Sequence, residues 1–372
     1  MSYQTAYSNN PDTGLAIKSI KSSLKRIVNP CLIIYFVSSK YPADKVSRLM
    51  AEAFPSAQTI GCTSAGEMVS GKMLTNSIVV MAFGKNSFYN IKAEVLENIS
   101  DDQQAAAKAL QNLGNYLNVP PMRISPSRYV GLVIIDGKSK REEYINDQIS
   151  NLTNVIFIGG SAATDIPDGN TYIFANGKTY TDAAVFLLLE PTNGFAFLKT
   201  QSLTVTDKKL TPTKVNELNR IVYEFDHQPA AKAYAQALNI TVDELPDYFA
   251  ANPLALVFDS KNYFVRDPHR ILDHGAIEFY CSVKKDMELA ILQVKDIMAN
   301  TSKDLEQALY NNRNLSAIIE FNSISRMIEL RKKKQGQEYA ALFKSIPTIA
   351  FGTFGESYIG HMNQTSTMLF LK

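Results

Sequence analysis

The chain has 372 residues, of which 45% are hydrophobic and 20% charged, and its formal net charge is +2 at pH 7. This composition is typical of a globular protein of one or two domains, and so small a net charge gives no field that would attract nucleic acid. The longest uninterrupted apolar run, Ala183–Leu189, is far shorter than the ~20 residues that a membrane-spanning helix needs.

The amino terminus and the cysteines indicate the compartment. The opening segment, MSYQTAYSNNPDTG, has no basic region followed by an apolar core, so it does not resemble a signal peptide. The three cysteines, Cys31, Cys62 and Cys281, are an odd number without a C-x-x-C motif. This pattern argues against a disulfide framework or a zinc ribbon and suits a reducing environment. We therefore expect a cytoplasmic protein that neither spans a membrane nor binds nucleic acid.

The first predicted unit begins with the apolar run CLIIYFV at 31–37, which is short and rich in β-forming residues and so indicates a buried strand. Segment 41–54 follows with apolar residues at helical spacing and a proline near its start. Residues 57–67, AQTIGCTSAGE, predict a strand that runs into a glycine turn, and residues 76–83 predict another strand.

The same order of strand, helix, strand with glycine turn, and strand recurs twice. In the second unit we expect these elements at 129–136, 139–152, 154–165 and 182–189. In the third unit we expect them at 315–322, about 324–343, 347–356 and 365–371. The recurrence predicts three β-α-β-loop-β units in a mixed α/β (α+β) fold.

A different region, about 192 to 312, separates the second unit from the third. Its candidate strands are 194–205, 221–225, 254–258, 262–266 and 277–283. Its candidate helices are 229–238, 242–250 and about 295–310. We expect the third unit to close back onto the other two, and we divide the chain into domains at 1–190 and 191–372.

The glycine turns are the most regular feature of the repeat. The first two align residue for residue, Ile60–Glu67 against Ile158–Asp165, with a hydroxyl two positions after the glycine and an acid six positions after it. The third turn is shorter and carries Gly352, Thr353 and Glu356. Ligands of α/β sheets usually bind just beyond the carboxyl ends of strands, so we expect the three turns to converge around a common cleft.

The glycines and polar residues of these turns suggest specific roles. We expect Gly61, Gly159 and Gly352 to adopt unusual backbone conformations or to pack tightly against another segment. The hydroxyls and acids of the turns can either contact a ligand or cap the turns that follow. Arg266 and Arg326 each follow an apolar strand, where they can anchor a carboxylate or form a surface ion pair.

Catalysis is the less favoured interpretation. GCTSAG is similar to a nucleophile elbow centred on Ser64, but Cys62 stands where that motif requires glycine. Cys62 itself would need a base, and the sequence ties no histidine to it. We expect Cys62 to be a small buried thiol and the protein not to be an enzyme, with a hydrolase that uses Cys62 or Ser64 as an alternative.

Six segments, in this order, resemble the FIST family, a bacterial sensory module with an N-terminal and a C-terminal part. They are TIGCTSAGEM, VIFIGGSAATD, VYEFDHQPAAKAYAQAL, NYFVRDP, AIIEFNSISR and FGTFGESYIGHMNQTSTM. The resemblance implies two FIST subdomains and a signal-transduction sensor without catalysis of its own. Such a sensor would bind a small ligand and regulate a partner histidine kinase, as in a two-component system, or a cyclic-di-GMP pathway.

The resemblance also implies ligands. NosP-like members of the family bind haem and report nitric oxide, so haem is the first ligand we expect. An amino acid or a similar metabolite is the alternative, for which Arg266 with Glu67 or Glu356 would supply the two charges. The candidate ligand-binding residues are Cys62, Thr63, Ser64, Glu67, Ser161, Asp165, Arg266, Arg326, Glu356, His361 and Asn363.

Four histidines are available for a haem iron. His361 stands in the loop that the repeat places at the expected cleft, so it is the first candidate axial ligand, and Cys281 is the competing donor. Glu356 or Asn363 would then accept the other ring N–H of His361; alternatively, His361 only holds the loop by a hydrogen bond to Glu356. The segment RDPHRILDHG, which contains His269, is typical of an exposed loop, and the run RKKK at 331–334 is typical of a solvated helix face.

Overall fold

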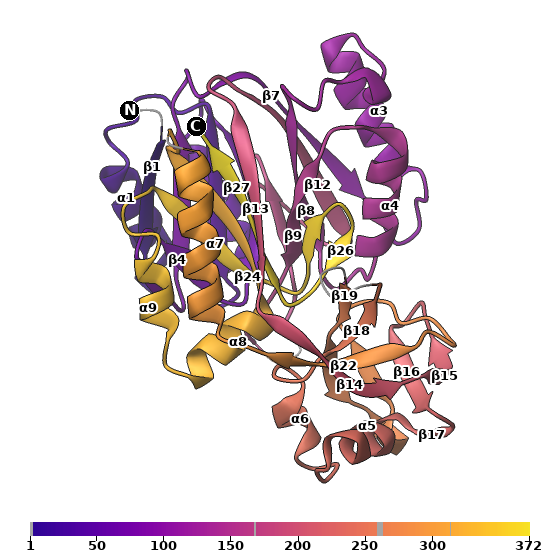
Figure 1. Ribbon diagram of the computed structural model, residues 1–372. Helices are drawn as coiled ribbons and strands as arrows, with labels where there is room; N and C mark the ends of the chain where they lie inside the picture. Colours follow the sequence, from indigo (N-terminus) through magenta and orange to yellow (C-terminus); the bar gives the residue numbers. More distant parts are fainter. Residues whose placement is uncertain (1–2, 167–168, 259–262, 313) are drawn as a thin grey trace.

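The computed structural model describes residues 3–166, 169–258, 263–312 and 314–372. The expected mixed α+β fold is confirmed. Three six-stranded sheets form the body of the molecule, and a smaller α+β insertion extends from one end of it (Figure 1). No helix in the described part of the chain is both long enough and apolar enough to cross a bilayer.

The body consists of three units with one common order of elements, and each begins earlier than the sequence predicts. The first unit comprises β1 (Tyr3–Ser8), α1 (Thr13–Ser23), β2 (Leu32–Ser38), α2 (Ala43–Ala53), β3 (Gln58–Ser64), β4 (Glu67–Val69), β5 (Lys72–Leu74) and β6 (Ile78–Phe83). The second comprises β7 (Phe88–Glu97), α3 (Ala105–Leu117), the short helix η1 (Pro121–Arg123), β8 (Val130–Asp136), α4 (Glu142–Leu152), β9 (Phe157–Ala162), β10 (Ile173–Ala175), β11 (Lys178–Tyr180) and β12 (Ala183–Pro191).

The third unit is interrupted by the insertion. It comprises β13 (Phe195–Gln201), then, after the insertion, α7 (Ile297–Asn311), β23 (Ala317–Ser323), α8 (Ile324–Lys332), α9 (Gly336–Ala341), β24 (Thr348–Thr353), β25 (Glu356–Tyr358), β26 (His361–Met362) and β27 (Thr365–Leu371). The insertion comprises β14 (Leu203–Leu210), β15 (Pro212–Asn216), β16 (Ile221–Phe225), β17 (Gln228–Pro229), α5 (Ala230–Leu238), α6 (Leu245–Tyr248), β18 (Leu254–Val257), β19 (Tyr263–Arg266), β20 (Pro268–Ile271), η2 (Asp273–Gly275), β21 (Ile277–Phe279) and β22 (Leu289–Val294).

The three units exchange their short hairpins in a closed ring. Strand β4 of the first unit pairs with β24 of the third, β10 of the second pairs with β3 of the first, and β25 of the third pairs with β9 of the second. Each sheet therefore contains strands from two units. This exchange confirms the expectation that the third unit closes onto the others, and it joins segments that lie far apart in the sequence.

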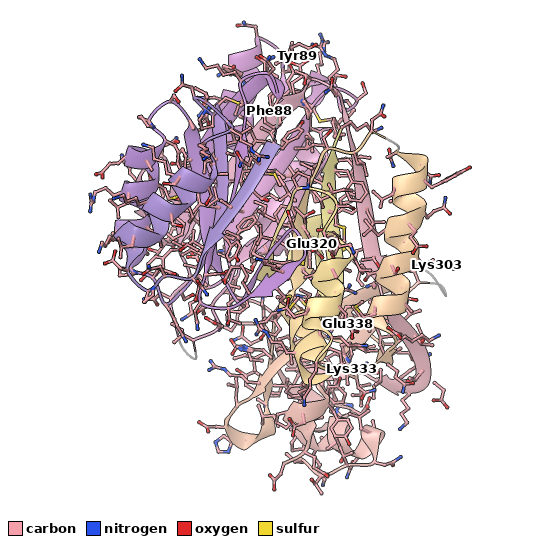
Figure 2. The ribbon with its side chains drawn as sticks, turned by 90° about the vertical axis from the view of Figure 1, so that its left-hand side faces the viewer. Phe88, Tyr89, Lys303, Glu320, Lys333 and Glu338 are labelled. Carbon is pink, nitrogen blue, oxygen red and sulfur yellow. The ribbon has the colours of Figure 1, made fainter. Side chains whose placement is uncertain are left out.

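The core follows from the apolar strands. The inner faces of all three sheets share one hydrophobic cluster, to which Phe36, Ile134 and Phe321 contribute from equivalent strands. The outer faces are covered by helices, with α1 and α2 on one sheet, α3 and α4 on the second, and α7 to α9 on the third (Figure 1). Figure 2 shows Glu320 inside the body and Lys303 on the outer side of α7. Glu320 is fully buried, and its carboxylate accepts a hydrogen bond from Ser366 at 2.6 Å.

Two of the three turn glycines are required by close packing. A Cβ atom on Gly61 would lie 2.1 Å from the carbonyl oxygen of Tyr35, and one on Gly159 would lie 1.7 Å from the carbonyl oxygen of Val133. A Cβ on Gly352 would meet the Ala65 backbone at 3.2 Å. None of these glycines has a positive φ. The prediction is thus confirmed through tight packing and not through unusual conformation.

Several predicted elements are wrong in their extent. The single helix expected at 324–343 is two helices, because Lys334 between α8 and α9 takes a left-handed conformation with φ 57°. The strand expected at 194–205 is divided at Ser202 into β13 of the body and β14 of the insertion. The predicted strand 262–266 begins at Asn262, which lies outside the described residues; β19 starts at Tyr263.

Candidate functional site

The turns of the three units meet where their parallel strands end, as the repeat predicts. Every pair of turns is joined by a backbone hydrogen bond. These bonds run from Ala65 N–H to Gly352 O at 3.0 Å, from Ala163 N–H to Thr63 O at 3.0 Å and from Ser161 N–H to Gly355 O at 2.9 Å. The convergence of the turns is therefore confirmed, and their backbones form one continuous platform.

The hydroxyl groups of the turns hold this platform together. Thr63 Oγ1 accepts from the N–H of Tyr172 at 3.0 Å, and Ser161 Oγ donates to Glu142 Oε1 at 2.9 Å. Both hydroxyl-bearing side chains are buried. Because a buried polar group is stable only with its partners in place, these bonds identify a structural role for Thr63 and Ser161.

Two of the three acids serve the same purpose. Glu67 accepts from the N–H of Ser77 at 3.2 Å and from its hydroxyl at 2.7 Å, and Ser64 also donates to Glu67. Glu356 accepts in the same way from the N–H of Thr365 at 3.1 Å. Both acids are fully buried. Each fixes the start of the last strand of its own unit, which is the capping alternative that the sequence leaves open.

The third acid, Asp165, is not equivalent to these two. In the exchanged hairpins, Glu67 pairs with Phe351 of the third unit and Glu356 pairs with Gly160 of the second. In the remaining hairpin, the residue that pairs with the equivalent position, Cys62, is Ile173 and not an acid. The alignment of the first two turns therefore fails after the strand ends. Asp165 is exposed instead, and it lines a cleft.

This cleft, with a volume of about 640 Å³, lies between the platform of turns and the insertion. Its body side is formed by Ala65, Asp165 and Phe354 from the three turns and by Ile324, Ile328 and Arg331 of α8. Its insertion side includes Arg220, His269, Arg270, Glu278 and Tyr280. Small-molecule sites commonly have volumes of about 300–1,000 Å³ and lie at domain junctions or at the carboxyl ends of strands. The cleft meets each of these conditions.

One buried carboxylate of the insertion holds three side chains at the cleft, two from the insertion and Lys140 from the body. Glu278 accepts from Lys140 at 2.6 Å and from Arg270 at 2.8 Å, and His269 Nδ1 lies 3.6 Å from it. The contact with His269, together with the two cations, holds the pKa of Glu278 well below its ordinary value. Glu278 is therefore ionised near neutral pH and keeps these groups in place along the cleft.

A buried ionic junction joins the insertion to the body behind the cleft. Arg220, which is 4% exposed, donates to Glu142 and Glu143 of α4 at 2.5 Å each and to the carbonyl of Tyr280 at 2.7 Å. Glu143 also accepts from the N–H of Ser282 at 2.7 Å. This network fixes the insertion side of the cleft relative to the body.

The two arginines predicted as carboxylate anchors lie away from the cleft lining. Arg326 is buried in the first turn of α8, where it donates to Asn322 at 3.0 Å and to Thr301 at 3.0 Å. Arg266 donates to the carbonyl of its neighbour Val265 at 3.1 Å. The expected juxtaposition of Arg266 with Glu67 or Glu356 is not among the ion pairs of the described residues.

His361 does not line the cleft either. Its imidazole is buried, and neither ring nitrogen has a hydrogen-bond partner among the described residues, so the predicted bond to Glu356 or Asn363 does not form. Asn363 Nδ2 donates instead to the carbonyl of Phe354 at 3.0 Å. Burial lowers the pKa of His361.

The surroundings of His361 fit a haem group poorly as they stand. A Cβ atom on Gly355 would lie 2.1 Å from Cε1 and 2.7 Å from Nε2 of the ring, so the imidazole packs directly on the backbone there. Haem ligation by His361 stays a prediction that requires the ring to leave this packing.

The cysteines are poorly placed for nucleophilic chemistry. Cys62 is buried in the middle of a sheet, and burial raises the pKa of its thiol well above the ordinary value. Cys281 follows β21 rather than lying inside a strand as expected, and its Sγ donates to the carbonyl of Val265 at 3.7 Å. Burial raises the pKa of Cys281 to about 11, so it is a neutral thiol near neutral pH.

We expect native thiol labelling to reflect this burial. Iodoacetamide at pH 8 should modify Cys62 and Cys281 more than about 100-fold more slowly in the native protein than in guanidinium, because the thiolate is the nucleophile and both thiols must first become exposed. Half-buried Cys31 is the internal comparison and should react first. Peptide mapping by mass spectrometry follows each site, and rapid native labelling of Cys62 would revive the hydrolase alternative.

Several cleft residues were not predicted from the sequence. His269 lies on strand β20 and not in an exposed loop. Arg331 faces the cleft, although the sequence predicts a solvated helix face for the RKKK run. Tyr280 and Glu278 belong to the insertion, whose contact with the turns has no local signal. The one indication in the sequence is that Glu278 and Tyr280 stand two residues apart, on either side of buried Phe279, because residues two apart in a strand share a face.

Two family models together match most of the chain. The FIST N domain model matches residues 31–228. The FIST C domain model matches residues 230–358. A comparison with curated proteins found no matching relative. The boundary between the two matches falls inside the insertion, whereas the division expected after residue 190 falls at the end of β12.

Proposed function

The chain belongs to the FIST family, and from this premise we propose that it is a cytoplasmic sensor whose small-molecule ligand binds in the cleft between the three turns and the insertion. FIST domains are associated with sensory signal transduction and are generally non-enzymatic. In this proposal the protein performs no catalytic step. It changes the activity of a partner signalling protein, for which a histidine kinase is the first candidate.

The observation that carries the proposal is the position of the cleft. All three units contribute residues to one wall, and the insertion supplies the other. A ligand in this position contacts both parts of the molecule, so it favours whichever relative orientation of the two gives it more contacts. A partner that contacts both the insertion and the body would then respond to the ligand.

The free cysteines are consistent with a reducing compartment. Cys31, Cys62 and Cys281 all carry free thiols in the described structure, and Cys31 is only partly buried. Unpaired thiols persist in the cytoplasm, where disulfides are rare. We propose that the sensor and its partner act there.

Binding in the cleft is tested with a variant that fills it. Ile328→Trp adds a large side chain on α8 where Ile328 lines the cleft, and Leu15→Trp adds the same side chain on the 56% exposed site of α1 as a control. A metabolite screen by thermal shift should find a ligand that stabilises the unchanged protein and the control but not Ile328→Trp. At 100 times its Kd such a ligand adds about 2.7 kcal/mol to the free energy of unfolding. Equal shifts in all three proteins would place the ligand elsewhere.

Haem is the first ligand to test. Reconstituted protein should develop a Soret band if haem binds, and the Ile328→Trp variant should take up less haem if the cleft is the site. His361 and Cys281 do not line the cleft, so a band that shifts in His361→Ala or in Cys281→Ala would mean that haem binds at that donor and outside the cleft. Absence of haem uptake leaves a metabolite as the ligand. The regulatory part is tested by autophosphorylation of a candidate histidine kinase with and without the sensor and its ligand.

A further inference from the structure

We propose that the cleft selects a planar aromatic molecule that carries an anionic group, an inference that rests on the proposed sensor function. The ring would lie against the aromatic side chains shared by the insertion and the third turn. The anionic group would face the basic side chains of α8 and β20. This assignment names the chemical class of the ligand, and three features of the cleft support it.

The first feature is a row of three rings across the cleft. The rings of His269 and Tyr280 have centroids 4.5 Å apart and an interplanar angle of 35°, and Tyr280 and Phe354 have centroids 5.5 Å apart at the same angle. All three residues line the cleft, two from the insertion and one from the body. Rings this close and roughly parallel stack on one another, so a flat ligand in the cleft would extend the stack from one of its ends, at His269 or at Phe354.

The second feature is the apolar wall beside this row. Ala65 and Ile324 belong to a small buried cluster, against which Ile328, Tyr280 and Phe354 pack. The same five residues line the cleft. A ring system in this position would leave water for an apolar surface, which is the main source of affinity in small-molecule sites.

The third feature is an excess of positive charge. Among the described residues that line the cleft, five are Lys or Arg and two are Asp or Glu. Glu278 offsets part of this charge through its contacts with Lys140 and Arg270, and Glu142 and Glu143 offset the charge of Arg220, so the remaining excess is small. A cleft lined mainly by one sign of charge concentrates ligands of the opposite sign.

Arg331 is the best-placed anchor for the anionic group. Its Nη2 donates to the carbonyl of Ala65 at 2.9 Å, which ties the guanidinium to the platform of turns. A guanidinium has five N–H groups in a fixed plane, so one bond to the backbone orients the others. A guanidinium held in this way can bind a carboxylate or a phosphate through two parallel hydrogen bonds.

The test compares matched ligands by isothermal titration calorimetry on the full chain. Indoleacetate and adenosine monophosphate are the aromatic anions. For indoleacetate, indoleacetamide lacks the charge and cyclohexylacetate lacks the aromatic ring. For adenosine monophosphate, adenosine lacks the charge and ribose phosphate lacks the aromatic ring. At least one aromatic anion should bind at least about tenfold more tightly than both of its matched compounds, because each matched compound lacks either the charge-assisted hydrogen bonds or the stacking contact. The proposal is overturned if neither does.

Variants then locate the two contacts. Arg331→Gln should weaken the aromatic anion about tenfold or more and leave the matched neutral compound unchanged. His269→Leu, at a side chain 38% exposed, should weaken the binding of every compound with an aromatic ring. Tyr280→Leu should have the same effect if the variant folds. Lys209→Gln, which removes an exposed charge elsewhere in the insertion, is the control and should bind as the unchanged protein does.

The two proposals fail in different ways. A cleft ligand that is neutral, cationic or without a ring would overturn the ligand class and leave the sensor function in place. If an amino acid without an aromatic ring binds more tightly than the aromatic anions, the ligand class is likewise wrong and the sensor function is unaffected. The absence of any metabolite whose binding is blocked by Ile328→Trp would overturn the sensor site itself.

Discussion

Arg220→Ala should lower the free energy of unfolding by about 3–5 kcal/mol, the largest effect that we expect from a single substitution outside the hydrophobic core. The variant removes the cation that faces two carboxylates at the junction of insertion and body. Arg220 and Glu142 are 4% and 1% exposed, and they approach within 2.5 Å. Removal of one partner from a buried pair leaves an uncompensated charge in a medium that solvates it poorly.

The substitution also disturbs the insertion itself. Arg220 takes a left-handed backbone conformation, with φ 58°, in the turn between β15 and β16. Its side chain donates to the carbonyl of Tyr280, so this bond to the cleft wall is lost with it. We therefore expect Arg220→Ala to weaken ligand binding in the cleft as well as to lower stability.

A matched ion pair in the same insertion provides the control. Lys209 Nζ lies 2.6 Å from Glu288 Oε1, close to the 2.5 Å between Arg220 and Glu142, but the side chains of Lys209 and Glu288 are 56% and 62% exposed. Lys209→Ala should change the free energy of unfolding by no more than about 1 kcal/mol, because water screens exposed pairs. Urea denaturation measures both variants. Equal losses in the two variants would show that burial of Arg220 does not decide its contribution.

The inner strands were predictable because their composition is decided locally. Strands β2, β8 and β23 bury both faces, so their sequences are mostly apolar, although β23 includes the buried polar residues Glu320 and Asn322. The edge strands β1 and β7 were missed for the same physical reason. Their sequences, YQTAYS and FYNIKAEVLE, are half-buried and mix polar with apolar residues, so no apolar run indicates them.

The hairpin exchange could not be predicted because its pairing partners lie in other units. Strand β4 contains three residues, and nothing in EMV indicates whether it pairs with its own unit or with β24. The insertion presents the same difficulty. It separates β13 from α7, so the first strand and helix of the third unit appear to belong to the intervening region. The division after residue 190 stays a prediction.

The candidate site was predictable in its position and not in its composition. The glycine turns marked the carboxyl ends of the strands, where the cleft lies. Residues on those turns are mostly used to hold the turns together, and the cleft is lined instead by neighbours such as Phe354 and by residues of the insertion such as Tyr280. A single sequence places neither against the other, because their contact depends on how the insertion docks.

Buried acids beneath the platform make the stability of the body depend on pH. Burial raises the pKa of Glu67 to about 7 from an ordinary value of 4.5, although hydrogen bonds from Ser64 and Ser77 lower it and nearby Asp165 adds to the increase. Between these two pKa values the folded chain keeps the proton that the unfolded chain loses. The contribution of Glu67 to stability is therefore fully present below pH 4.5 and decreases as the pH rises through 7.

Glu67→Gln removes this titration, so its stability relative to the unchanged protein should rise as the pH increases from about 4.5 to about 7 and then stay level. The amide oxygen can accept from Ser77 as the carboxylate does, and the amide N–H can donate to the hydroxyl of Ser64. Relative to the unchanged protein, the free energy of unfolding of the variant should rise by about 2–3 kcal/mol between about pH 5 and about pH 8.5.

The control is Glu52→Gln, which removes the same charge at a side chain of α2 that is 56% exposed. Its free energy of unfolding should differ from that of the unchanged protein by less than about 0.5 kcal/mol at either pH. Urea denaturation at the two pH values measures all three proteins. A constant difference between Glu67→Gln and the unchanged protein would mean that Glu67 ionises in the folded chain as it does in water, and that the hydrogen bonds of Ser64 and Ser77 outweigh its burial.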